Sequence, residues 1–322
     1  MNKELKGIAV AGSILVDEIN HISTYPRVGT LSRINKVESS VGGLVSNDGI
    51  NIKKINPEIP VYAYGKIGDD EKGKYVIETF NKAGICTSNI RTDDESKTSF
   101  TQVMSVDGGE RTFFTYPGAS GKFGYDDIDF DNISAGIFHL GYFLLLEKID
   151  NGDGEKILKK LKESGIETSI DLVSSASGGY DRVLSCLKYV DYLIVNEIEA
   201  SGLCGTENCH DLQILAKKLK ELGVIKKVII HKEDKACVYD GESYLELNSL
   251  EIPAREIKGK TGAGDAFCSG CLTEIYRGGT NEEILDFGIR AAAVSLSSAN
   301  ATDGIKTKEE IIKKTNRYDR KK

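Results

Sequence analysis

The stretch Lys260-Thr261-Gly262-Ala263-Gly264-Asp265-Ala266-Phe267 decides how the chain is interpreted. Two glycines spaced two apart allow a tight turn, because glycine reaches unusual dihedrals at low cost. The apolar residues after it recur at helical spacing until Gly278-Gly279, which predicts a helix beginning in this stretch. The unpaired N–H groups of a helix N-terminus bind anions. Asp265 therefore suits a base that takes a hydroxyl proton beside a transferred phosphoryl group, or it only caps the helix.

Length and composition bound the class of protein. The chain has 322 residues, which fits one large α/β domain or two ordinary ones, and its net charge of -7 argues against nucleic acid or an anionic membrane as a partner. No apolar run approaches a membrane span, and the N-terminus lacks the apolar centre of a signal peptide. Seven scattered cysteines fit a reducing compartment. We therefore expect a cytoplasmic protein.

Strand and helix signals alternate along most of the chain. This alternation implies an α/β fold, a three-layer α/β/α sandwich with a mostly parallel central sheet. A hairpin is expected at 236–247 and a long apolar helix at 284–298, while the charged segment 306–322 is expected to fray. Strands are predicted at 7–11, 61–67, 136–140, 167–172, 191–195 and 227–231. Helices are predicted at 69–84, 154–164, 180–190 and 211–222.

Two β-rich segments interrupt the alternation. The first spans 18–37, and the second spans 98–116 with a hairpin turn at Asp107-Gly108-Gly109. We expect the two segments to form a separate small sheet, a lid that excludes water from a reaction. The predicted division is an α/β catalytic domain of residues 1–17, 38–97 and 117–322, with a discontinuous β lid of residues 18–37 and 98–116.

Polar residues follow several predicted strands. Asp17 comes just after the first strand, where open α/β sheets place ligand contacts. Gly42-Gly43 precede a helix, and Asn47 in its first turn carries an amide that both donates and accepts, as sugar hydroxyls require. Asn196 and Glu199 follow the strand 191–195 and suit phosphate and water-coordinated Mg²⁺. Asp17 is favoured as a ligand contact because of the motifs that follow it, whereas Asn47 and the Asn196–Glu199 pair, taken alone, favour ordinary polar turns.

Taken in order, these motifs resemble the ribokinase-like carbohydrate kinases, the phosphofructokinase-B group, over nearly the whole chain. The resemblance implies transfer of the γ-phosphoryl of ATP to a sugar hydroxyl with Mg²⁺, and a homodimer formed through the lid. It further implies a role for each matching residue: Asp265 as base; Gly262, Ala263 and Gly264 as anion hole; Asp17, Gly42, Gly43 and Asn47 as sugar contacts; Asn196, Glu199, Lys232 and Thr261 on the nucleotide and Mg²⁺ side, with Glu199 reaching the metal through water.

The chain departs from the family pattern in two places. Gly259 and Lys260 stand where the family has Asp and Thr, and that Asp helps to hold a monovalent cation. Potassium activation is therefore not expected, and the Lys260 ammonium is a candidate replacement for the ion. The family's glycine-rich nucleotide loop is replaced by residues 231–236, where Glu233 and Asp234 should repel phosphates unless Lys232 or Lys235 compensates.

Several alternatives remain open at this point. A nucleoside or pseudonucleoside kinase would need a base-stacking aromatic residue in the lid, a sugar-phosphate kinase would need basic residues, and a non-catalytic sugar-binding protein would not hold ATP. His139 is either a sugar contact or a core histidine, and Cys268-Ser269-Gly270-Cys271 is interpreted as helix packing rather than a redox or metal pair. The candidate lid residues are Tyr25, Phe113 and Tyr116 for stacking and Arg27, Arg33 and Arg111 for phosphate.

Overall fold

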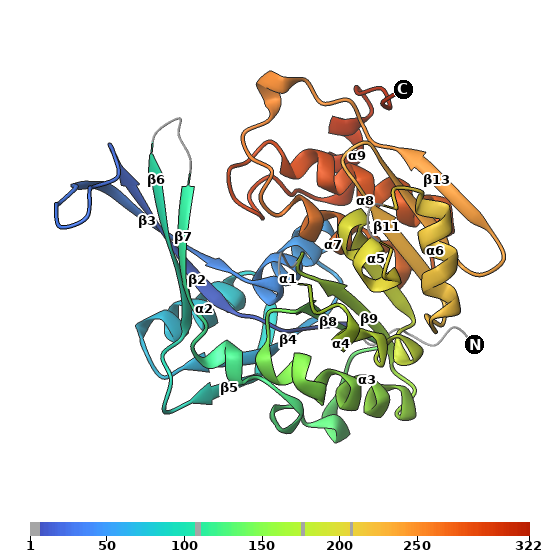
Figure 1. The fold of residues 1–322 in the computed structure, drawn as a ribbon, viewed down its shortest axis with the longest axis horizontal. Coiled ribbons are helices and arrows are strands. Elements are labelled where there is room, and N and C mark those ends of the chain that lie inside the picture. Colours follow the sequence, from blue (N-terminus) through green and yellow to red (C-terminus); the bar gives the residue numbers. More distant parts are fainter. Residues whose placement is uncertain (1–6, 107–110, 175–177, 207–208) are drawn as a thin grey trace.

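The computed structural model describes residues 7–106, 111–174, 178–206 and 209–322, and its main element is a nine-stranded sheet (Figure 1). The strands from β5 to β11 are parallel, and only β12 and β13 add antiparallel pairs at one edge. The predicted mostly parallel sheet is confirmed. From edge to edge the strands are β13 (Tyr244–Asn248), β12 (Lys235–Tyr239), β11 (Lys227–His231), β10 (Tyr192–Asn196), β9 (Glu167–Leu172), β8 (Ile137–Phe143), β1 (Ile8–Ala11), β4 (Val61–Gly68) and β5 (Ile85–Asp93).

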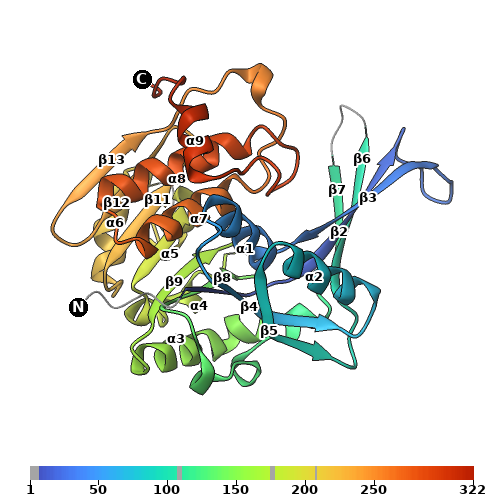
Figure 2. The same cartoon turned by 180° about the vertical axis from the view of Figure 1, so that it is seen from behind.

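Helices cover both faces of this sheet (Figures 1 and 2). One face carries α1 (Leu44–Ile55), α2 (Glu71–Lys82), α7 (Ala263–Tyr276) and α8 (Asn281–Ser295), and the other carries α3 (Gly154–Glu163), α4 (Asp181–Leu184), α5 (Glu197–Cys204) and α6 (Leu212–Glu221). Successive strand residues point to opposite faces, so Ile8 and Val10 pack under the first group and Ala9 and Ala11 under the second. The predicted three-layer sandwich is confirmed.

A separate four-stranded sheet projects from the sandwich (Figure 1). Its order is β3-β2-β6-β7, from β2 (Leu15–Ile22), β3 (Ile34–Gly42), β6 (Ser99–Val106) and β7 (Arg111–Tyr116). The sheet is longer than the predicted 18–37 segment, because the pairing of β2 with β3 continues to Leu15 and Gly42 at the sandwich. The predicted turn at Asp107-Gly108-Gly109 lies outside the described residues, although β6 and β7 pair antiparallel as expected.

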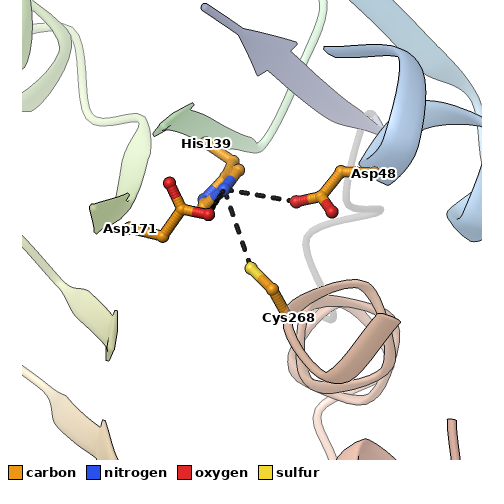
Figure 3. A group of neighbouring side chains, drawn as sticks. All are labelled: Asp48, His139, Asp171 and Cys268. Atoms are coloured by element: carbon orange, nitrogen blue, oxygen red, sulfur yellow. Dashed lines mark hydrogen bonds and ion pairs between the residues drawn. The ribbon is translucent and has the colours of Figure 1, made fainter. Parts of the chain in front are cut away.

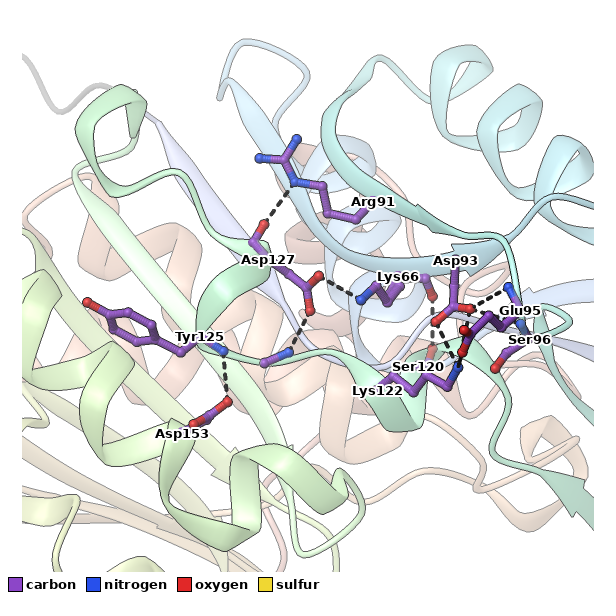
Figure 4. Close-up of polar contacts among 11 residues, drawn as sticks. Lys66, Arg91, Asp93, Glu95, Ser96, Ser120, Lys122, Tyr125, Asp127 and Asp153 are labelled. Carbon is purple, nitrogen blue, oxygen red and sulfur yellow. Dashed lines mark hydrogen bonds and ion pairs between the residues drawn. The ribbon is translucent and has the colours of Figure 1, made fainter.

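Polar contacts fix the segment that follows β7 to the edge of the nine-stranded sheet (Figure 4). Lys66 of β4 forms an ion pair of 2.7 Å with Asp127, and Arg91 of β5 donates to the Asp127 carbonyl at 3.0 Å. Lys122 reaches Asp93 at the end of β5 at 3.3 Å. Because Asp127 and Lys122 belong to the segment returning from β7, these contacts anchor that segment to the sheet edge.

Some local predictions were wrong. β5 and α5 were not predicted, because an edge strand with one neighbour alternates weakly and α5 is only 8 residues long. The expected helix at 180–190 is reduced to α4 and a 3-10 turn at Leu187–Tyr189. Among the described residues, no helix combines the length and apolar character needed to cross a bilayer.

The C-terminal segment is ordered, contrary to the expected fraying. It forms α9 (Lys308–Thr315), which begins with a reciprocal cap between Thr307 and Glu310. Ile311 is fully buried in a cluster with residues of α1, α7 and α8, and Lys308 pairs with Glu274 of α7 at 2.6 Å. The apolar residues of this charged segment therefore tie the chain end to the core.

Substitution Ile311→Ala is expected to lower the free energy of unfolding by about 2–5 kcal/mol, because it leaves a cavity between α9 and the core. Urea unfolding followed by circular dichroism measures the change. Lys313→Ala, on the exposed side of the same helix, is the control and should stay within about 0.5 kcal/mol of wild type. Equal stabilities of the two variants would show that α9 does not contribute to the core.

Candidate active site

Asp265 lies in the first turn of α7, at the edge of the sheet where the parallel strands end. The turn before it requires glycine at position 262, because φ is +77° there and an added Cβ would lie 2.3 Å from Ala301. Asp265 is 8% exposed, in a helix turn where unpaired N–H groups attract negative charge. The predicted loop-to-helix turn is confirmed.

Two side chains hold the Asp265 carboxylate. Asn47 of α1 donates from its amide to Asp265 Oδ2 at 2.8 Å. The hydroxyl of Tyr142 lies 2.9 Å from Oδ1 and 3.1 Å from Oδ2. Burial raises the pKa of Asp265 to about 7, and the charges of Asp48 and Asp171 add to that effect. The carboxylate is therefore poised to exchange a proton near neutral pH.

Tyr142 was missed in the sequence. It is the next-to-last residue of β8 and has a φ of +58°, which is rare outside glycine and recurs nearby at Leu144 with a φ of +74°. The strand loses its regular register with β9 between Leu140 and Phe143. This backbone distortion directs the Tyr142 ring toward α7, and no local sequence pattern signals it.

The predicted sugar contacts gather where the small sheet joins the sandwich. A Cβ at Gly42 would lie 2.4 Å from Asp17 Oδ2, and Gly43, at φ +82°, would clash with the Ser13 carbonyl at 2.6 Å. Asn47 donates its backbone N–H to the Gly43 carbonyl at 3.0 Å, while its amide reaches Asp265. Burial raises the pKa of Asp17 to about 6. The structure thus brings Gly42 beside Asp17, and the helix that follows Gly43 carries Asn47 to Asp265.

A cavity of about 470 Å³ lies beside the N-terminus of α7. Its polar side includes Asn196, Lys232 and Lys260, and its floor includes Ala263 and Gly264. The cavity thus joins the predicted nucleotide residues Asn196 and Lys232 to the glycine turn. Thr261 is exposed next to the cavity and does not line it. The apolar wall is formed by Phe267, Leu250, Ile252, Ile257, Ile289 and Leu296.

Asn196 and Glu199 form a reciprocal helix cap rather than a polar loop. Asn196 caps α5 by accepting from the Glu199 N–H at 2.9 Å, and Glu199 Oε2 accepts from the Asn196 N–H at 2.9 Å. Ser174 donates to Glu199 Oε1 at 2.8 Å. Glu199 is 4% exposed and lies behind Asn196, and burial raises its pKa to about 7. In the sequence, the signal for this cap was the spacing of three residues between Asn196 and Glu199.

Lysines pair with the acidic groups of the 231–236 loop. Lys232 lies 3.4 Å from Asp234, and Lys260 lies 3.3 Å from Glu233 at the exposed rim of the cavity. Lys235, by contrast, pairs with Glu246 of β13 at 2.8 Å and does not line the cavity. Each loop carboxylate therefore has a lysine partner, which reduces the repulsion of phosphates expected from the sequence.

His139 is a core histidine rather than an exposed sugar contact. It is 0% exposed on β8, and its Nδ1 lies 3.0 Å from the Ser169 hydroxyl on β9. Cys268 and Cys271 are both buried free thiols that face different neighbours, since Cys271 donates to the Ile284 carbonyl and Cys268 approaches His139. They do not form a redox pair.

The chain resembles several known proteins over most of its length. A ribokinase from Arabidopsis thaliana is 25% identical over 312 residues, covering 95% of this chain and 80% of the relative. A probable chloroplastic fructokinase-6 from the same plant is 24% identical, covering 93% of this chain and 80% of its own length. Both relatives are named as sugar kinases, and both align with nearly all of this chain.

Solved structures share the fold. The ribokinase of Thermotoga maritima superposes with a TM-score of 0.81 at 22% identity, covering 95% of this chain and 97% of its own. The Arabidopsis ribokinase solved with ribose and ATP also has a TM-score of 0.81, at 24% identity and 95% coverage of this chain. A ribokinase-type sandwich with a small separate sheet is therefore confirmed. Residues 6–308 match the family described as pfkB family carbohydrate kinase, and the chain belongs to that family.

Proposed function

We propose that this protein transfers the γ-phosphoryl group of ATP to a hydroxyl of a small carbohydrate, with Asp265 as the base. One observation carries the proposal: the buried Asp265 carboxylate accepts from Asn47, and Ala263 and Gly264 directly before it line the 470 Å³ cavity. A hydroxyl bound beside Asn47 could give its proton to Asp265 while a phosphoryl group sits over the turn. The reaction needs mainly positioning and charge stabilisation.

The sugar is proposed to lie against Asp17, Gly42, Gly43 and Asn47. Both positions require glycine, because a Cβ at Gly42 would meet Asp17 and a Cβ at Gly43 would meet Ser13. Asp17 accepts from hydroxyl groups and the Asn47 amide both donates and accepts, which matches the chemistry of a polyol. Asn47 also bonds Asp265, so the same residue would orient the sugar and the base.

The transferred group is proposed to be stabilised by the N–H groups of Gly262, Ala263 and Gly264. These groups begin α7, whose dipole favours an anion. The triphosphate would pass along the cavity toward Lys232 and Thr261, with the base of the nucleotide against the apolar wall. Lysine side chains bind phosphate as point charges, and Lys232, whose side chain is 20% exposed, lines this cavity.

Mg²⁺ is proposed to bind on the cavity side of Asn196, with Glu199 behind it. Both Glu199 oxygens already accept hydrogen bonds, so Glu199 would act on the ion through water and through Asn196, which lines the cavity. When bound, Mg²⁺ neutralises phosphate charge and orients the triphosphate. Among the solved structures that share the fold, a putative ribokinase II from E. coli was solved with ATP and Mg²⁺, at a TM-score of 0.77 and 18% identity.

A nucleoside or pseudonucleoside kinase is the second candidate. Residues directly opposite in a sheet share a face, so Asp17, Thr101 and Thr115 point the same way. Phe113, two residues before Thr115, shares that face and is 61% exposed, which suits stacking on a base. Tyr116 is on the opposite face, against Phe100 at 5.3 Å. Arg111 shares the Asp17 face as well, so a sugar phosphate belongs among the substrates to be tested.

A homodimer through the small sheet is also proposed, and here the exposed apolar residues of that sheet support it. Val28 and Leu31 in the β2–β3 loop are 106% and 90% exposed. On the strands, Val37, Phe113 and Phe114 are each 59–61% exposed. Large apolar groups clustered on one projecting element are typical of a protein interface. The edge strands β3 and β7 also leave backbone groups available for pairing.

The first test is a screen for ADP release with ATP and Mg²⁺ across pentoses, hexoses, nucleosides and sugar phosphates. We expect a saturable rate with a free sugar. A rate confined to nucleosides would establish the second candidate. Absence of turnover with all four classes, together with no thermal shift on adding ATP, would instead support a sugar-binding protein without catalysis.

Substitution Asp265→Asn is expected to lower kcat by about 10²–10⁴ while sugar affinity hardly changes, because the amide keeps the shape but cannot take a proton. Steady-state kinetics and sugar titration by calorimetry measure the two effects. Glu282→Gln, an exposed acid in the first turn of α8, is the matched control and should retain wild-type turnover. A near-normal kcat in Asp265→Asn would remove Asp265 as the base.

The pH dependence should report the Asp265 carboxyl. Since the base works as a carboxylate and its pKa is about 7, kcat/KM should fall as pH drops through about 7. Tyr142→Phe removes a donor that favours the charged form, so the Asp265 pKa and the midpoint of the acid limb should rise. Tyr192→Phe, whose hydroxyl bonds Glu167 in β9, is the control. A lower midpoint in Tyr142→Phe would contradict this assignment.

The double variant Val28→Glu, Leu31→Glu is expected to be monomeric, because two charges would be buried in the proposed interface. Sedimentation equilibrium measures its mass against that of wild type. Ile214→Glu, on α6 and 56% exposed, is the control and should leave the mass unchanged. A monomeric wild-type protein, or a dimeric double variant, would disprove assembly through this sheet.

A further inference from the structure

Four side chains with metal-binding atoms meet inside the sandwich (Figure 3). Asp48 comes from α1, His139 from β8, Asp171 from β9 and Cys268 from α7. Their exposed fractions are 0%, 0%, 8% and 2% in that order, and one ligand atom from each lies within 4.8 Å of the others. The function proposed above assigns no role to this group, which we call the buried cluster.

A proton alone does not satisfy the buried cluster. His139 Nε2 lies 3.3 Å from Asp48 Oδ2, 3.8 Å from Asp171 Oδ2 and 3.7 Å from Cys268 Sγ. The single N–H at Nε2 can point at only one of these three atoms. All three distances also exceed the roughly 2.7–2.9 Å of a charge-assisted hydrogen bond. Within the described part of the chain, Asp48 Oδ2 is buried without any hydrogen-bond partner. Its ion pair with His139 Nε2, at 3.3 Å, is long, so this buried oxygen has room for a closer cation.

Hydrogen bonds outside the buried cluster orient three of its members. His139 Nδ1 lies 3.0 Å from Ser169 Oγ, which leaves Nε2 directed inward. Ser269 donates to Asp48 Oδ1 at 3.0 Å. The Tyr142 N–H donates to Asp171 Oδ1 at 2.6 Å. In each case the outer atom is held and the inner atom faces the centre, which is the arrangement that supports metal ligands in proteins.

We propose that the buried cluster binds one transition-metal ion of the zinc type, with Asp48, His139, Asp171 and Cys268 as its ligands. Imidazole nitrogen, thiolate sulfur and carboxylate oxygen are the donors that Zn²⁺ takes. In a tetrahedral site with ordinary bond lengths, neighbouring ligand atoms lie roughly 3.4–3.6 Å apart. The three contacts of His139 Nε2, at 3.3, 3.7 and 3.8 Å, lie within about 0.2 Å of this spacing. Small rotations of the two carboxylates would close the remaining distances.

Metal binding balances the charge of the buried cluster. Burial alone would lower the pKa of His139, but the nearby Asp171 and Asp48 outweigh it and raise that pKa to about 9. Burial also keeps the Cys268 thiol protonated. A divalent ion would displace the imidazole proton and the thiol proton to solvent. Two positive charges would replace two protons, and the net charge of the group would stay the same.

This site is separate from the Mg²⁺ position proposed beside Asn196. The buried cluster lies where α1 packs on α7. Its residue Asp48 directly follows Asn47, and its residue Cys268 comes three residues after Asp265. A metal here would cross-link both helices to β8 and β9. The site would therefore hold the sugar contact and the base in register, while the metal itself would not touch the substrate.

Cobalt and zinc titration of the metal-stripped protein, without ATP or Mg²⁺, tests the proposal. We expect one equivalent of Co²⁺ to bind with the near-ultraviolet absorption of a cobalt–thiolate bond, and one equivalent of Zn²⁺ to displace it and raise the melting temperature. Cys268→Ser should abolish that absorption. Cys271→Ser is the matched control, because Cys271 is buried on the same helix outside the buried cluster, and it should keep the absorption.

Ser169→Ala provides a second variant in case Cys268→Ser folds poorly. Loss of its contact with His139 should weaken zinc affinity by about 10–100-fold, with the protein still folded. Absence of stoichiometric metal binding in wild type, or cobalt–thiolate absorption that persists in Cys268→Ser, would overturn the proposal and leave a protonated histidine between two carboxylates. Both readouts are independent of kinase activity, so this result and the failure of the proposed function are distinguishable.

Discussion

The hydrogen bonds that Asn47 and Tyr142 make to Asp265 are the contacts on which the active-site region depends. They join α1, the end of β8 and the start of α7, three elements far apart in the sequence. The carboxylate is buried among other acids, so without these donors its charged form would be strongly disfavoured. The burial that costs stability is the same feature that brings the pKa of a carboxyl group close to neutrality.

The inner face of the sheet under α1 and α7 is polar where β8 and β9 lie side by side. His139, Ser169 and Asp171 occupy positions that apolar residues fill in the neighbouring strands. Buried charges of this kind rarely add stability over well-packed apolar residues, so their presence here points to a role beyond folding. Asp48 and Asp171 lie near enough to raise the pKa of Asp265, which couples this polar core to the proposed base.

Local sequence patterns predicted the elements with strong local causes. The glycine turn and helix at 262–276 follow from dihedral preference and helical spacing, and the small sheet follows from two β-rich segments outside the alternation. β5 was not predicted, because it lies at the edge of the sheet with one neighbouring strand. Such a strand does not need a strict alternation of apolar and polar residues. The charged C-terminal segment was misjudged because two apolar residues of α9 decide its packing, and composition does not show which residues are buried.

The sequence by itself determined the parallel sandwich, the small sheet, and the glycine turn that carries Asp265, because these depend on spacing and on dihedrals that act over a few residues. Only the tertiary structure decided that Tyr142 bonds Asp265, that Asn196 and Lys232 share one cavity with the turn, and that Asp48, His139, Asp171 and Cys268 meet. Those contacts join residues 32–220 positions apart, from His139 with Asp171 to Asp48 with Cys268. Their formation depends on how helices cross strands and on one positive φ, and neither is encoded in a short stretch of sequence.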